Sequence, residues 1–174
     1  MGGEHMGVVL ELYTLAVDAT GIYMINDGGQ AWRTGRIDAD TDVFAELELL
    51  AYEYEPGLAL PIIHGTSNRQ DGPHMVHTFV AVAETAPFVQ FVLARWPDAM
   101  PLTPQGAAEV GPAIPHASNA RPYPRDADVL LHAVRHLRFL RDTDDGARED
   151  MSLHLRRHLT AFEPVLNRMY GQTA

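Results

Sequence analysis

The chain has 174 residues, of which 46% are hydrophobic, and this suits one globular domain with one hydrophobic core. A formal net charge of −10 argues against general binding to nucleic-acid backbones, and the absence of Cys excludes disulfides, thiolate metal sites and Cys nucleophiles. No apolar run approaches the ~20 residues that cross a bilayer, so we expect no membrane insertion.

Residue usage also bears on source and location. Lys is absent, so all 13 basic residues are Arg, which is typical of a high-GC bacterial genome. A chain without Cys fits the reducing cytoplasm, and no basic-then-apolar segment marks a signal peptide at the N-terminus. We interpret residues 1–5 as a cloning remnant, because Met6 follows a His.

The first elements read as a β-hairpin. Residues 8–17 and 22–25 are rich in aliphatic and β-branched side chains, and Asp18-Ala19-Thr20-Gly21 between them is a turn signal. Residues 26–29 predict a second turn or loop.

An acidic helix follows over residues 42–55. Val43, Leu47, Leu50 and Tyr54 form one apolar stripe at helical spacing, and we expect all four to be buried against a sheet. Asp40, Thr41 or Asp42 would cap the N-terminus of this helix, and Pro56-Gly57 would end it.

The rest of the chain predicts two more strands and a helical end. We expect strands over 58–64 and 75–83, joined by a polar loop over 65–73, and a short helix over 86–95. Seven prolines between 97 and 124 predict a connector without long regular structure, assigned to 97–125. Helices over 128–141 and 147–170, the second interrupted near Pro164, would form an antiparallel hairpin within 126–170. The sum is an α/β or α+β domain with one main mixed sheet, a packed helix and a C-terminal helical hairpin.

The stretch from Trp32 to Leu58 resembles the Nudix hydrolase family. The resemblance covers about residues 8–95: a strand leads through Trp32 and the turn at Gly35 into an acidic helix that ends at Gly57-Leu58. It implies a Nudix-like mixed sheet with that helix packed on it. In that family, carboxylates on the helix hold magnesium ions that activate water against a diphosphate.

The family's carboxylates are only partly present. Glu55 fits one metal-binding Glu and Asp42 stands in for the upstream acid, whereas Tyr54 and Ala51 occupy positions that the chemistry needs as acids. We therefore expect a non-hydrolytic ligand-binding or accessory protein. The alternative is a divergent metal-dependent hydrolase of a nucleotide-like diphosphate, with Mg as its cofactor. Its candidate ligands are Asp42, Glu46, Glu48 and Glu55.

A small anionic ligand would bind in a cleft between the acidic helix and the loop over 65–73. Cationic and aromatic side chains near this cleft would hold it. The candidate ligand-binding residues are Trp32, Arg33, Arg36, His64, Arg69, His74 and His77.

The helical end carries two further features. His132 and His136, like His154 and His158, are four residues apart, so each pair shares a helix face and the four imidazoles are candidates for a zinc site. Most of the Arg residues also lie in this region, so a third interpretation is an interaction module that binds a partner, or a second copy of the chain as a homodimer, through the Arg-rich tail.

Overall fold

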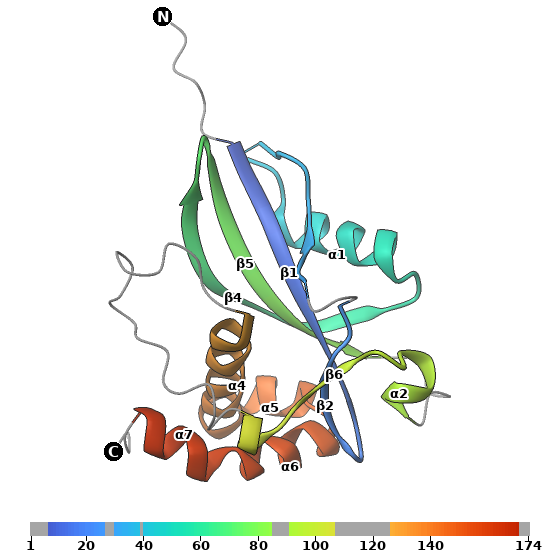
Figure 1. The fold of residues 1–174 in the computed structure, drawn as a ribbon, viewed down its shortest axis with the longest axis vertical. Coiled ribbons are helices and arrows are strands. Elements are labelled where there is room, and N and C mark those ends of the chain that lie inside the picture. Colours follow the sequence, from blue (N-terminus) through green and yellow to red (C-terminus); the bar gives the residue numbers. More distant parts are fainter. Residues whose placement is uncertain (1–6, 27–29, 39, 85–90, 107–125, 171–174) are drawn as a thin grey trace, which may run out of the picture.

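The fold is α+β: one mixed sheet carries helices on both faces (Figure 1). The computed structural model describes residues 7–26, 30–38, 40–84, 91–106 and 126–170. The sheet order is β4-β5-β1-β2-β6, and β3 also pairs with β1. β1 runs parallel to β5, and every other pairing is antiparallel. The strands are β1 Gly7–Asp18, β2 Gly21–Met24, β3 Trp32–Arg33, β4 Ala59–Asp71, β5 His74–Glu84 and β6 Met100–Leu102.

The predicted first hairpin is confirmed. β1 and β2 pair from Leu15 with Met24 to Asp18 with Gly21. The Asp18 carboxylate closes the turn by accepting hydrogen bonds from the backbone N–H and hydroxyl of Thr20 and from the Gly21 N–H. Asn26 then continues the pairing with its side chain, which accepts from the Thr14 N–H at 2.7 Å and donates to the Leu12 carbonyl at 2.9 Å.

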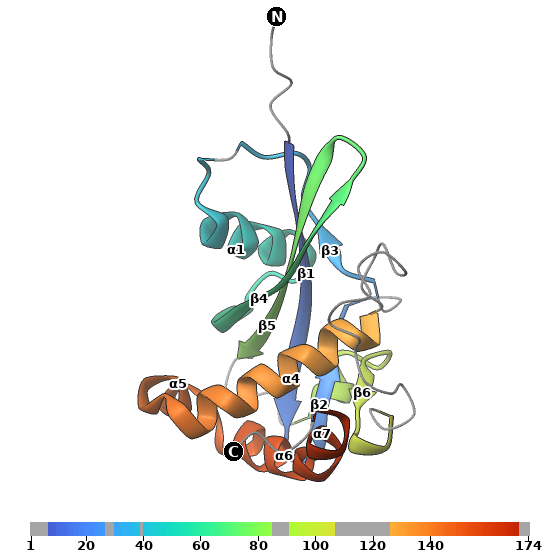
Figure 2. The same ribbon diagram turned by 90° about the vertical axis from the view of Figure 1, so that its left-hand side faces the viewer.

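The predicted loop over 65–73 is wrong, because β4 continues through it. β4 and β5 form a long hairpin that closes between Asp71 and His74, so only Gly72 and Pro73 form the turn. Gly72 has φ of 58°, the left-handed region that favours glycine. The segment was predicted as a loop because it is polar. It is polar because this end of the hairpin extends beyond the helices that cover the sheet (Figure 2).

Two hydrophobic cores lie on opposite faces of the sheet. Side chains alternate between the faces along β1, as the pleat of a strand requires. Leu10 and Leu12 belong to the core beneath helix α1, whereas Tyr13 and Leu15 belong to the core beneath the C-terminal helices.

Helix α1 (Val43–Tyr54) confirms the predicted acidic helix. Asp42 caps it, and Gly57, with φ of 94°, follows its end. Leu47 and Leu50 are buried and Val43 is half-buried. Tyr54 departs from the prediction, because 52% of its surface is exposed.

The C-terminal region has four helices where we predicted two. α4 (Asp126–Thr143) matches the first predicted helix. The predicted interruption of the second helix near Pro164 is confirmed, because Pro164 lies in the first turn of α7. A further division was not predicted: Ser152 starts a new helix by accepting a hydrogen bond from the Leu155 N–H. The second arm of the predicted hairpin thus consists of three helices, α5 Asp145–Asp150, α6 Leu153–Ala161 and α7 Glu163–Tyr170.

The C-terminal helices bury their apolar faces against the sheet. Leu155, Leu159, Phe162 and Leu166 lie in one core with residues of β1, β2 and β5. Leu153 is an exception, since it is 53% exposed.

The segment between β5 and α4 is described only in part. The helix predicted over 86–95 appears as α2 (Val92–Arg95), and residues 85–90 lie outside the described residues, as does most of the predicted connector. The described beginning of that connector forms β6, which pairs with β2. Among the described helices, none has the length and apolar character needed to cross a membrane.

Candidate functional site

Asp42, one of the candidate metal ligands, caps the N-terminal end of α1. The Asp42 carboxylate accepts hydrogen bonds from the backbone N–H groups of Phe44 at 3.1 Å and Ala45 at 3.3 Å. Without this oxygen those two donors would lack a partner in the helix. The sequence-based prediction of a cap is therefore confirmed.

Glu55, a second candidate metal ligand, lies at the C-terminal end of α1 and contacts α2 and the residue that follows it. Glu55 accepts a hydrogen bond from the indole N–H of Trp96 at 3.0 Å, and the Arg95 guanidinium lies 3.7 Å from its other oxygen. The same guanidinium lies over the Trp96 ring, 4.5 Å from its centroid. A cation and a donor thus fix the carboxylate between two helices.

Between these ends, the other candidate acids do not converge. Asp42 and Glu55 lie at opposite ends of α1, roughly 20 Å apart at 1.5 Å per residue. Glu48 is exposed and Glu46 is half-buried. Within the described part of the chain, no group of three or more His, Cys, Asp or Glu is arranged to hold a metal ion.

Two of the aromatic residues near the predicted cleft stack on one another. The rings of Trp32 and Tyr54 lie 5.2 Å apart with an interplanar angle of 7°. Trp32 is buried, whereas Tyr54 covers it from the solvent side. Tyr54, which takes the place of an expected carboxylate, therefore closes the end of the core beneath α1.

The predicted ligand-binding residues divide between the two faces of the sheet. Trp32 packs in the core beneath α1, and His77 points to that same face, because it alternates with Val76 and Thr78 along β5. Arg33, His64, Arg69 and His74 occupy the opposite face, and Arg36 lies against Gly7 at the start of β1. The structure does not bring these seven residues into one site.

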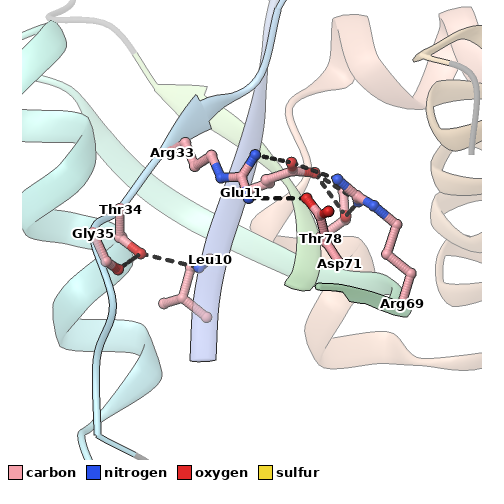
Figure 3. Close-up of polar contacts among 8 residues, drawn as sticks. All are labelled: Leu10, Glu11, Arg33, Thr34, Gly35, Arg69, Asp71 and Thr78. Atoms are coloured by element: carbon pink, nitrogen blue, oxygen red, sulfur yellow. Dashed lines mark hydrogen bonds and ion pairs between the residues drawn. The ribbon is translucent and has the colours of Figure 1, made fainter. Parts of the chain in front are cut away.

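Arg33 and Arg69 instead belong to a polar network across four strands (Figure 3). At its centre is Glu11 of β1, which is buried and was not singled out in the sequence. Arg69 donates to both of its oxygens, at 2.7 and 2.9 Å, and the Thr78 hydroxyl donates to one at 3.2 Å. Arg33 lies 3.8 Å from Glu11 and 3.4 Å from Asp71.

This network positions strands rather than presenting a reactive group. Glu11 is the buried anion that Arg69 neutralises, and the bidentate geometry holds β4 at a fixed position relative to β1. The hydrogen bonds to Glu11 raise the pKa of Arg69. Beside the network, the Thr34 hydroxyl accepts from the Leu10 N–H at 3.0 Å and joins the chain after β3 to β1 (Figure 3).

Histidines form a second cluster, between β4 and α4. The rings of His64 and His136 stack with centroids 3.6 Å apart and an interplanar angle of 8°, and Phe139 lies beside His136. Burial lowers the pKa of His136, because a charged imidazole loses more hydration than a neutral one.

Three of the four histidines proposed for zinc, His136, His154 and His158, have separate environments. His136 stacks on His64, and His158 makes a 2.7 Å hydrogen bond to the Asp18 carbonyl oxygen. His154 is exposed, and the side chain of His132 lies outside the described residues.

Arg residues of the C-terminal region connect its own helices. Arg141 donates to Glu163 and to the Thr160 hydroxyl, at 2.9 and 2.7 Å, and Arg138 lies 3.5 Å from the same glutamate. These contacts join α4 to α6 and α7. Arg138 and Arg141 thus stabilise the packing of the C-terminal helices on one another.

The buried Asp18 carboxylate connects the first hairpin to α2. It accepts from the Val92 N–H at 2.8 Å in addition to its turn contacts. Burial favours its neutral form, but the hydrogen bonds from Thr20, Val92 and Gly21 outweigh burial and lower the pKa of Asp18.

No protein-family model and no curated protein sequence matches the chain.

Proposed function

We propose that the chain is a Nudix-like scaffold without hydrolytic activity, which acts as a ligand-binding or accessory protein in a bacterial cytoplasm. The position of Glu55 carries this proposal. It is the residue that best fits a metal-binding Glu of the family, and its two oxygens contact Trp96 and Arg95. A magnesium ion would have to displace a cation and an indole donor from this carboxylate.

Three further observations support the proposal. Asp42 uses an oxygen to cap α1, and Tyr54 covers Trp32 where a carboxylate would be needed. The order of β3, the turn, α1 and the hairpin of β4 and β5 is compatible with a Nudix-like scaffold. A shared scaffold does not determine a shared reaction.

Metal-dependent thermal stability tests the proposal. A ligand that binds the folded chain raises its melting temperature by mass action. We expect millimolar Mg²⁺ or Mn²⁺ to leave the melting temperature of the wild type unchanged. Glu55→Gln should lower the melting temperature by the same amount with and without metal, because the neutral amide loses the ion pair with Arg95, whereas its oxygen can still accept from Trp96.

A metal-induced rise in the wild type that is absent in Glu55→Gln would contradict the proposal and support the hydrolase alternative. Glu149→Gln is the matched control, since this exposed glutamate lies on α5 away from α1. It should behave as the wild type in both conditions.

A further inference from the structure

The side of α1 that faces away from the sheet carries an exposed apolar patch. Phe44, Leu49 and Tyr52 are 58%, 57% and 65% exposed. They lie on two adjacent rows of the helix, at spacings of four residues, together with exposed Ala45, Glu48 and Glu53. We call these six residues the outer face of α1: Phe44, Ala45, Glu48, Leu49, Tyr52 and Glu53.

The charged side chains of this face are all acidic. Glu48 and Glu53 lie within it, Glu46 lies beside it, and α1 contains no Arg. No cation among the described residues forms an ion pair with Glu48 or Glu53. Aromatic and apolar side chains among acids offer both hydrophobic contact and attraction for a cationic surface.

We propose that the outer face of α1 docks an amphipathic helix of a basic partner protein. Such a helix would place its apolar stripe on Phe44, Leu49 and Tyr52, with flanking Lys or Arg residues beside Glu48 and Glu53. The inference goes beyond the proposed function, because it assigns a partner to exposed side chains of α1 that take no part in the contacts of Glu55.

A second copy of the chain fits this face less well. The chain has a net charge of −10, so two copies repel one another. Several cations of the tail are already paired within it, since Arg141 and Arg138 contact Glu163 and Arg148 contacts Asp145. A basic partner would gain attraction from both the local and the net charge.

Binding of a fluorescent peptide tests the proposal. The probe is a helix-forming peptide of about 15 residues, with Leu on one face and Arg on the other, and its fluorescence anisotropy reports binding. We expect saturable binding to the wild type. Glu48→Arg with Glu53→Arg should weaken binding by about tenfold or more. The double variant Leu49→Ser, Tyr52→Ser should also weaken peptide binding by about tenfold or more.

Matched controls change the same chemistry elsewhere on the surface. Glu149→Arg with Asp150→Arg alters the net charge equally but on α5, and Phe139→Ser removes an exposed aromatic residue from α4. Both controls should bind within about twofold of the wild type. The proposal would be overturned if both charge reversals weakened peptide binding equally, or if neither of them weakened it.

Two independent measurements separate the other outcomes. Light scattering that shows a wild-type dimer, lost in the Glu48→Arg, Glu53→Arg variant, would assign the face to a second copy and overturn the basic partner. Magnesium-dependent turnover together with peptide binding at α1 would leave the docking surface in place and remove the proposed function.

Discussion

The guanidinium of Arg69 meets the carboxylate of Glu11 in a two-point ion pair between β4 and β1, with β5 lying between these strands. The two side chains are 14% and 11% exposed, so water screens the pair poorly. Because the partners are far apart in sequence, this contact exists only when the long β4–β5 hairpin is correctly placed.

Removing Arg69 should be costly for stability. Arg69→Met would leave the Glu11 carboxylate buried beside Thr78 without its main cation, and we expect a loss of about 3 kcal/mol in the free energy of unfolding. Urea denaturation measures the loss. Arg33→Met is the control, because Arg33 is 45% exposed and its ion pair with Glu11 should contribute less than about 1 kcal/mol. Equal losses in the two variants would contradict this account of the network.

The buried side of α1 should be sensitive to cavities. Leu47 is fully buried, so Leu47→Ala should cost about 2–5 kcal/mol through lost burial and the cavity left behind. Leu49→Ala on the exposed side of the same helix should change stability by no more than about 0.5 kcal/mol. A denaturation experiment in which the two variants are equally stable would show that α1 does not pack as described.

Acid should weaken the contact between α4 and the sheet. Burial lowers the pKa of His136 in the folded chain, so the unfolded chain takes up a proton first as the pH falls below the ordinary histidine value of about 6.5. The stability that neutral His136 contributes is thus present above that pH and is lost as the pH falls towards the lowered value.

Melting temperatures at several pH values between neutral and mildly acidic test this relationship. The wild type should lose more stability on acidification than His136→Gln, which cannot be protonated. His154→Gln should follow the wild type, because His154 is exposed. Identical pH profiles for the wild type and His136→Gln would exclude His136 as the cause.

Short sequence patterns predicted those parts of the fold that depend on interactions between residues close together in the chain. The stripe at Leu47 and Leu50, the cap at Asp42 and the stop at Gly57 follow from helix periodicity and backbone hydrogen bonding, and all three are present. The turn at Asp18 was recognised for the same reason.

Long-range contacts could not be predicted in this way. Glu11 lies in an otherwise aliphatic strand, and only the pairing of β1 with β5 and the hairpin of β4 with β5 reveals Arg69 as its partner. The polar end of β4 looked like a loop, because one sequence does not show which strands extend beyond the helices. Glu55 was likewise predicted as a candidate metal ligand, because one sequence does not show that Trp96 and Arg95 contact it in the fold.

Turnover of nucleoside diphosphate conjugates shows directly whether the chain hydrolyses a diphosphate. Purified chain is mixed with a panel of these compounds and millimolar Mg²⁺, and released phosphate is followed after phosphatase treatment of the products. We expect no release above a blank without protein, because Glu55 contacts Trp96 and Arg95, and Tyr54 stacks on Trp32. Magnesium-dependent release that disappears in Glu55→Gln would contradict this expectation.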